Sequence, residues 1–325
     1  MYRFLLLLVA VFTFISCDDN GKENDRILST SSGNINNLSV IMENDLWQGE
    51  VGEAIRDHLA APVDGLPQDE PLFSMNQMPP EAFSGFTRKN RIFLKIEKGK
   101  PADIKVGNDL FAQPQTGVIV SGETDEEIAS LIAENAENMI SAFKKTELKE
   151  KQRRISKSLK DDSRLEEELG VSIKFPDAYR YAKDEDSFFW IRKDIPNGSM
   201  EIIVYEVPVN TIQKDSNIIG NIIEMRDSIG EQHIPGPLDS HMITEAAYAP
   251  YLFTTEVDGK FAYETKGTWE TNKNVFMAGP FVNYAVLDEK NNRFVVLEGF
   301  AFAPSASKRD NMFELEAILK SAKFK

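Results

Sequence analysis

The chain has 325 residues, 42% of them hydrophobic and 10% aromatic, and carries 37 Lys and Arg against 52 Asp and Glu, for a net charge of −15. This composition excludes a disordered chain, because so many apolar residues can form a sizeable core, and the length suits about two domains. Phosphate groups repel so acidic a chain, so we expect no nucleic-acid partner and no basic patch for anionic lipids.

The first sixteen residues have the pattern of a bacterial secretory signal. Arg3 supplies a positive charge, residues 4–15 are apolar apart from Thr13, and the small residue Ser16 precedes Cys17. This apolar run is too short to cross a hydrocarbon core, which needs roughly 20 residues. The ending Phe-Ile-Ser-Cys resembles a lipobox, so we predict cleavage after Ser16 and lipidation of Cys17. The alternative is an ordinary cleaved signal followed by an incidental cysteine.

A lipidated Cys17 would make the membrane itself the first partner of the protein. Several acyl chains hold a protein on a membrane far more firmly than one chain does. We therefore expect a lipid-anchored protein of the cell envelope, at the outer membrane on its periplasmic or surface face. Cys17 is the only cysteine, so the core has no internal disulfide.

Changes in composition divide the chain into four parts. Residues 17–33 are polar, rich in Asn, Ser and Gly, and without periodicity, which is typical of a flexible tether. The predicted parts are the signal peptide 1–16, the lipidated cysteine and tether 17–33, an N-terminal α+β lobe with a connecting helix 34–165, and a C-terminal α+β lobe 166–325.

The pattern of the N-terminal lobe predicts strands at 38–42, 91–96 and 116–121 and two helices. Trp47, Val51, Ile55 and Leu59 recur every four residues, which indicates one face of a helix. A capping box, Thr124-Asp-Glu-Glu127, begins a second amphipathic helix that reaches Phe143. Apolar residues are sparse over 144–168, so we expect an exposed helical connector there.

A proline-rich segment, residues 61–81, follows the first helix. Its five prolines exclude a regular helix, and Asp64-Gly65 marks a turn. Long loops in compact domains are often functional, and this one is too apolar for a free linker. We expect it to lie over the fold and to contact a partner, an envelope protein or a glycan. The candidate contact residues are Leu66, Asp69, Glu70, Leu72 and Phe73.

Three runs carry a resemblance to a known family: Gly33-Asn-Ile-Asn-Asn-Leu-Ser-Val40, Asp45-Leu-Trp47, and Pro62-Val-Asp-Gly-Leu-Pro-Gln-Asp-Glu-Pro-Leu-Phe73. They resemble an uncharacterised family of Bacteroidota lipoproteins that is catalogued as a domain of unknown function. The likeness covers the whole chain. It implies the class and location of the protein and assigns no ligand or catalytic residue.

The second half is rich in strand patterns. Strands at 187–193 and 200–207 flank a Pro-Asn-Gly-Ser turn, and Asp258-Gly259 and residues 288–292 mark two more hairpins. Residues 218–229 and 307–324 have the periodicity of helices. Because both halves end in a strand, a turn and an amphipathic helix, we predict two lobes of mainly antiparallel sheet backed by helices. Duplication of one unit is an open alternative to two unrelated lobes.

Two histidines and a carboxylate form the one constellation with possible chemistry. On a helix, His241 and Glu245 would share a face, and with His233 they could ligate a metal. This spacing matches no named metal motif, and the sequence contains no nucleophile elbow, P-loop or dinucleotide fingerprint. We therefore expect a non-catalytic binding module without a cofactor. The alternatives are a metal-assisted hydrolase and a glycan-binding protein that uses Trp190 or Trp269.

Overall fold

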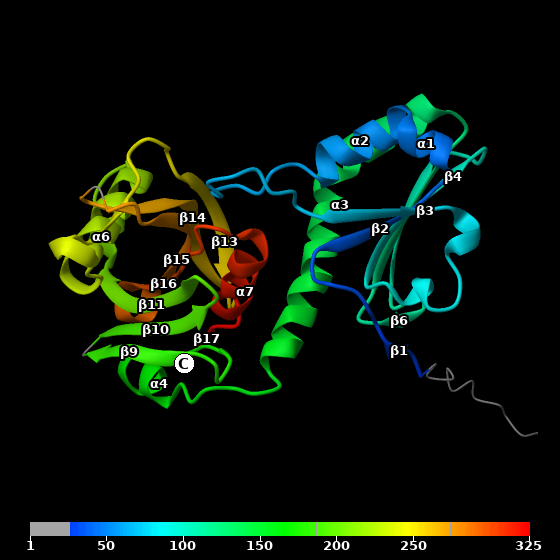
Figure 1. Cartoon of the computed structure of the whole chain (residues 1–325). Coiled ribbons are helices and arrows are strands. Elements are labelled where there is room, and N and C mark those ends of the chain that lie inside the picture. The colour runs from blue at the N-terminus through cyan, green and yellow to red at the C-terminus, as the bar shows by residue number, and fades with distance from the viewer. Residues whose placement is uncertain (1–26, 186, 274) are drawn as a thin grey trace, which may run out of the picture.

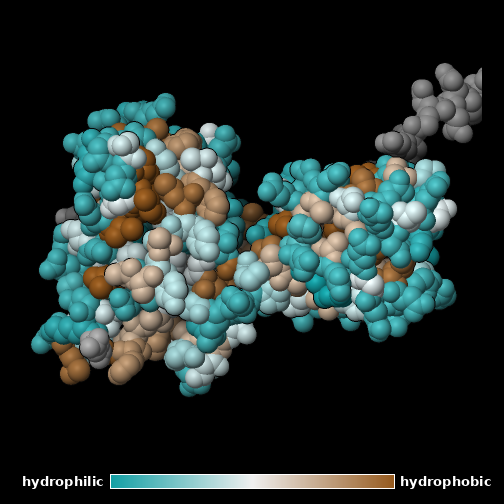
Figure 2. Space-filling model, turned by 90° about the horizontal axis from the view of Figure 1, so that it is seen from above, coloured by the Kyte–Doolittle hydropathy of each residue, from teal (hydrophilic) through white to brown (hydrophobic). Residues whose placement is uncertain are grey.

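The protein folds into two lobes joined along one long helix. Figure 1 shows the computed structural model, which describes residues 27–185, 187–273 and 275–325. Figure 2 shows the lobes from above, meeting at a narrower waist. Both lobes combine sheet and helices, so the expected α+β class is confirmed. The predicted signal peptide, Cys17 and the first part of the tether lie outside the described residues.

The sheet of the N-terminal lobe is mostly parallel. Its strands lie in the order β3 (Ser74–Met78), β2 (Asn37–Ile41), β4 (Ile92–Lys98), β7 (Thr116–Gly122) and β5 (Asp103–Asn108). Only β5 runs antiparallel to its neighbour, β7. The prediction of mainly antiparallel sheet is therefore wrong for this lobe, although antiparallel pairs predominate over the whole chain. Helices connect β2 to β3, and such crossovers place strands parallel.

Three helices cover one face of this sheet: α1 (Asn44–Gln48), α2 (Glu50–Leu59) and α3 (Asp125–Ile155). The predicted first helix is broken at Gly49, where α1 turns into α2. A Cβ at Gly52 would lie 1.9 Å from the carbonyl oxygen of Trp47, so only glycine allows this close turn. The predicted capping box is confirmed in part, because Thr124 accepts from the Glu127 N–H while Glu127 accepts from the Glu123 N–H.

The predicted exposed connector is wrong in its first half. Helix α3 continues unbroken to Ile155, and its polar residues Glu147 and Glu150 are buried. The guanidinium of Arg91, the residue directly before β4, lies 2.9 Å from the Glu147 carboxylate and also donates to the Asn34 carbonyl. A buried ion pair thus fastens α3 to the sheet and to the point where the tether meets the fold.

The C-terminal lobe is a curled, antiparallel eight-stranded sheet. Its order is β12 (Met242–Thr244), β14 (Lys260–Thr271), β15 (Ala278–Asp288), β16 (Arg293–Phe302), β11 (Gly198–Pro208), β10 (Phe188–Ile195) and β9 (Arg180–Glu185), with β13 (Tyr251–Val257) paired to β14. The turns at 196–199, 258–259 and 288–292 are confirmed. Because this strand order differs from that of the N-terminal sheet, the halves are not copies of one unit.

Helices cover both faces of the curled sheet, where one covered face was expected. Helices α4 (Ser163–Leu169) and α7 (Arg309–Leu319) pack on one face, and α5 (Val209–Ile212) and α6 (Ile218–His233) pack on the other. Strand β10 alternates as predicted, with Phe189 and Ile191 in the first core and Phe188 and Trp190 in the second. Two short strand pairs lie outside the two large sheets. They are β1 (Ser29–Thr30) with β6 (Ala112–Gln113), and β8 (Val171–Ser172) with β17 (Lys323–Phe324).

The expected boundary between residues 165 and 166 falls within α4, whose Leu165 and Leu169 belong to the C-terminal core. Among the described residues, no helix combines the length and apolar character that a membrane span requires.

Candidate functional site

The proline-rich segment lies between the two lobes. Phe73 is fully buried in the N-terminal core, where its ring meets that of Phe143 edge-on at 5.8 Å. Leu72 packs against the same core and Leu66 against the core of the other lobe. The expectation that the segment lies over the fold fits this arrangement. As a contact residue for a partner, however, Phe73 is ruled out because it already fills the protein's own interior, and Leu72 is partly buried against the same core.

Glu70 is also engaged within the chain. Its carboxylate accepts the backbone N–H groups of Lys308 at 2.6 Å and Arg309 at 3.0 Å, at the N-terminus of α7. The Arg309 guanidinium returns a hydrogen bond to the Pro71 carbonyl. A carboxylate at a helix N-terminus satisfies free N–H groups and interacts favourably with the helix dipole. Glu70 therefore joins the N-terminal lobe to α7.

The predicted turn at Asp64-Gly65 brings the segment against β14. Gly65 has φ +79°, and a Cβ there would lie 2.8 Å from the backbone nitrogen of Gly267. Glycine is needed for both reasons, the left-handed conformation and the close approach of two backbones. The turn is thus a contact between lobes.

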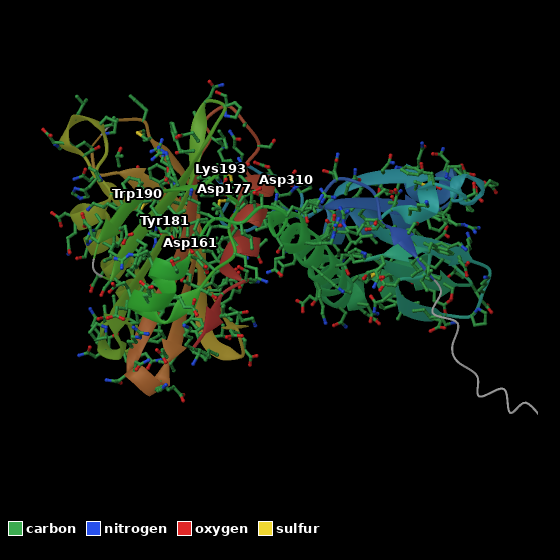
Figure 3. All side chains as sticks on the ribbon, turned by 90° about the horizontal axis from the view of Figure 1, so that it is seen from below. Asp161, Asp177, Tyr181, Trp190, Lys193 and Asp310 are labelled. Atoms are coloured by element: carbon green, nitrogen blue, oxygen red, sulfur yellow. The ribbon has the colours of Figure 1, made fainter. Side chains whose placement is uncertain are left out.

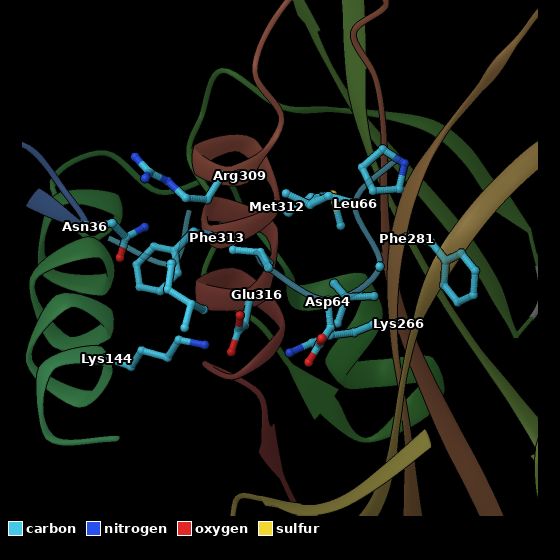
Figure 4. Close-up of a pocket in the computed structure, with 15 residues that line it drawn as sticks. Asn36, Asp64, Leu66, Lys144, Lys266, Phe281, Arg309, Met312, Phe313 and Glu316 are labelled. Atoms are coloured by element: carbon cyan, nitrogen blue, oxygen red, sulfur yellow. The ribbon is translucent and has the colours of Figure 1, made fainter. Parts of the chain in front are cut away.

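Beneath this turn, charged side chains from three elements meet in a small cavity of about 50 Å³ (Figure 4). Lys144 comes from α3, Lys266 from β14 and Glu316 from α7, and Glu316 accepts from Lys320 at 2.8 Å. Burial raises the pKa of the Glu316 carboxyl, but the charges of Lys320, Lys266 and Lys144 outweigh it and bring the pKa to about 2. Burial lowers the pKa of the Lys144 amine. The cavity has room for only a few water molecules, so it leaves no space for a ligand. Of Lys144, Lys266, Glu316 and Lys320, only Lys144 comes from the N-terminal lobe.

A larger hollow, the junction groove, lies on the outer side of the same turn. It has a volume of about 570 Å³ and runs between residues 62–69 and 245–251. Its walls carry the carboxylates of Asp64, Asp69 and Glu245 and the rings of Tyr248 and Tyr251, which are 69% and 50% exposed. Of the candidate contact residues, Leu66 and Asp69 line this groove.

The groove continues onto the outer strand β13. Tyr251 and Phe253 lie on one face of β13 with parallel rings whose centroids are 6.3 Å apart. Leu252, Phe253 and nearby Phe261 are each 37–40% exposed. Among the described strands, β13 pairs with β14 alone. Its outer edge therefore offers backbone groups to another strand.

The three proposed metal ligands are not brought together. His233 ends α6 and stacks on Phe188, with ring centroids 4.0 Å apart, while Glu245 accepts from the Thr268 hydroxyl. Between His241 and Glu245 the chain is the extended strand β12 and not a helix, so the two residues are separated by about 13 Å along the strand. In the part of the chain that the structure describes, no three His, Cys, Asp or Glu side chains are grouped as metal ligands. The metal hypothesis is therefore wrong for these residues.

The two tryptophans considered for glycan binding do converge. Trp190 and Trp269 line one cavity of about 310 Å³, the tryptophan cavity, on the α6 face of the C-terminal sheet. Figure 3 shows Trp190 on the C-terminal lobe, farther from the junction than Asp310 of α7. The cavity also contains Glu201, whose carboxylate accepts from the Trp190 indole N–H at 2.8 Å. Burial raises the pKa of the Glu201 carboxyl, against the opposing effect of hydrogen bonds from Ser199 and Trp190 and the charge of Arg192.

Comparisons with known proteins agree with the resemblance seen in the sequence. The family model described as "Domain of unknown function (DUF4837)" matches residues 158–321, half of the chain. The chain belongs to this family. A second model, "Domain of unknown function (DUF8532)", matches residues 31–156, so the DUF4837 region corresponds to the C-terminal lobe and the other model to the N-terminal lobe. No curated protein matched the chain.

Solved structures share only a distant likeness. The cyanobacterial PsbP protein CyanoP from Synechocystis sp. PCC 6803 is 12% identical with a TM-score of 0.33, over 52% of this chain and 93% of its own. LpqN, involved in cell envelope biogenesis of Mycobacterium tuberculosis, is 13% identical with a TM-score of 0.28, over 47% and 82%. A mutant of the protein Mog1 is 9% identical with a TM-score of 0.30, over 48% and 90%. Scores this low carry no functional information.

Sequence reasoning missed the aromatic residues of the groove and the polar residues of the cavity. Tyr248 and Tyr251 lie within the strand that the sequence predicts over 248–257, before the Asp258-Gly259 turn, and an outer strand cannot be told from an inner one by its own residues. Glu201 lies in a strand whose other residues, apart from Glu206, are mostly apolar, and a carboxylate within such a run is a signal that could have pointed to a buried polar site.

Proposed function

We propose that the protein is a lipid-anchored, non-catalytic binding module of the cell envelope, and that it binds an extended segment of a partner protein at the junction groove and along β13. The secretory signal and Cys17 support the location. The exposed aromatic strand β13 is the single observation that carries the binding role.

An exposed outer strand with large apolar side chains is unusual in a protein that has no partner. Proteins usually protect such strands with Lys, Pro or a covering segment, because the free backbone groups attract other strands. β13 has the sequence YLFTTEV, with neither Lys nor Pro, and its four N-terminal residues are exposed. Addition of a peptide strand would pair the free backbone groups and cover the rings of Tyr251 and Phe253.

The negative charge of the junction groove favours a peptide with basic side chains. Asp64, Asp69 and Glu245 line the same groove as Tyr251, and the whole chain has a net charge of −15. An acidic segment would be repelled, whereas Lys or Arg side chains would meet carboxylates at the end of the strand. The proposed ligand is therefore an extended segment that alternates basic and β-branched residues.

Labelled decapeptides test this proposal by fluorescence anisotropy. A peptide that alternates Lys and Val should bind, and one that alternates Glu and Val should not. The double variant Tyr251→Ser, Phe253→Ser should abolish binding, and Asp64→Asn with Asp69→Asn should weaken it and reduce its salt dependence. Phe86→Ser is the matched control, since Phe86 is 71% exposed on the other lobe. Equal binding of both peptides, or binding that survives the double variant, would contradict the proposal.

A further inference from the structure

We propose that the tryptophan cavity is a second binding site, which takes a neutral sugar ring. The site is separate from the junction groove and does not depend on the function proposed for it. Four features support it: the shape of the cavity, its polar groups, the balance of its charges and the strained loops at its rim.

The cavity is built where α6 ends and no longer covers the sheet. Trp190, Trp269, Phe300 and Phe302 rise from four positions on the sheet, and Met242 and Met277 close the sides. Trp269 meets the ring of Phe300 edge-on at 5.6 Å and donates its N–H to the Ala301 carbonyl, which fixes its orientation. Aromatic rings held in this way present flat apolar surfaces, while the flexible methionines adapt to the outline of a ligand.

The polar groups of the cavity gather around Glu201. One oxygen of this buried carboxylate accepts the Trp190 N–H, and Arg192 Nη1 lies 3.6 Å from the other oxygen. The hydroxyl-bearing residues Ser199 and Thr271 also line the cavity. A carboxylate has about four lone-pair positions, so Glu201 can still accept hydrogen bonds from a ligand, and Arg192 can donate to one.

This combination of groups selects the class of ligand. An acyl chain would cover Glu201 and Arg192 without pairing their polar atoms, which is costly. An anion would meet the Glu201 carboxylate, and a cation would meet the Arg192 guanidinium. A pyranose ring is neutral, has an apolar C–H face for the tryptophans and carries hydroxyls that both donate and accept. A volume of about 310 Å³ is small for a ligand site and suits one or two rings.

The two loops at the rim have an unusual backbone. Leu238 and Asp239 in one loop and Phe276 in the other have positive φ angles of 56°, 55° and 52°. Bulky residues rarely adopt this conformation, and such strain concentrates at ligand sites. The loops are joined by a hydrogen bond from Lys273 Nζ to the Leu238 carbonyl. The side chains of Leu238 and Phe276 are 79% and 98% exposed, so each loop presents an apolar tip beside the cavity.

Saturation-transfer NMR on the mature full chain tests the proposal. The probes are glucose, galactose, mannose, N-acetylglucosamine and their β1,4-linked disaccharides, with octanoate as the acyl alternative. At least one sugar should show transfer from the protein. Glu201→Gln, which keeps the shape of the side chain, should weaken its binding about tenfold or more, the value of a hydrogen bond to a charged group. Trp190→Ala should remove the signal.

Two controls show whether a loss of sugar binding comes from the tryptophan cavity itself. They exclude an effect of the junction groove and an effect of misfolding. Tyr251→Ser changes the groove alone and should leave the sugar signal unchanged. The circular dichroism spectrum and the thermal midpoint of the Glu201→Gln protein should match those of the parent chain. If no sugar shows transfer, if octanoate binds in place of sugars, or if a sugar binds equally to the Glu201→Gln protein, the proposal is overturned.

Discussion

Replacement of Glu316 by Gln should lower the unfolding free energy of the protein in a pH-dependent way. The Glu316 side chain is 21% exposed and accepts from Lys320 at 2.8 Å. Burial disfavours its charged form, but the charges of Lys320, Lys266 and Lys144 outweigh burial and hold its pKa at about 2, below the ordinary value of 4.5. That difference corresponds to about 3 kcal/mol of unfolding free energy at pH 7.

The sign of the pH dependence follows from the lowered pKa. An acid whose pKa is depressed in the folded state stabilises the fold above its unfolded pKa, and this stabilisation is lost as the pH falls through the folded pKa. The contribution of Glu316 should therefore be complete at pH 7 and fall to roughly half or less of that value at pH 3. The Gln variant, which is neutral throughout, should approach the parent protein as the pH is lowered.

Urea unfolding at pH 7 and pH 3 measures this difference. Asp310→Asn is the matched control on α7, because the Asp310 side chain is 61% exposed and should change stability by less than about 0.5 kcal/mol. If Glu316→Gln is as stable as the parent at pH 7, or if its deficit is the same at both pH values, the charge cluster does not stabilise the fold as described.

Three further predictions concern the anchor, the segment 61–81 and the core. Cys17→Ala should move the protein from the membrane to the soluble fraction without changing its thermal midpoint, and membrane retention would contradict lipidation. Glu70→Ala should lower the unfolding free energy by about 1–2 kcal/mol through loss of the α7 cap, whereas a neutral effect in urea unfolding would mean that water replaces it. Phe73→Ala should lower the unfolding free energy by about 3–5 kcal/mol, whereas Phe86→Ala should leave it almost unchanged. Similar losses of unfolding free energy for both variants would contradict the burial of Phe73.

Local patterns in the sequence were enough to predict most elements of the C-terminal lobe. The Asp258-Gly259 hairpin and the alternation of Phe188 to Ile191 depend on neighbours in the chain, and both are confirmed. The predictions from sequence fail where residues far apart in the chain determine whether a side chain is buried. Glu147 and Glu150 have the composition of a solvated helix face, but Arg91, far away in sequence, makes them interior residues.

The candidate site residues also depend on contacts between distant parts of the chain, which the sequence does not reveal. Leu72 and Phe73 are too apolar for a free loop, yet the sequence does not reveal that Phe73 fills the protein's own core and that Leu72 packs against it. His241 and Glu245 were placed on one face by assuming a helix, and an extended strand removes that geometry. Trp190 and Trp269 were considered separately, and only the curl of the sheet shows that they share a cavity.

Hydrogen–deuterium exchange on the mature chain tests the central claim most directly. With a saturating amount of the alternating Lys and Val peptide, the backbone amides of β13, residues 251–257, should exchange more slowly, since a new strand would pair with its free edge. Amides of β9, the strand at the opposite end of the sheet, serve as the internal control and should not change. Unchanged exchange in β13, or equal protection of β9, would contradict the proposed binding site.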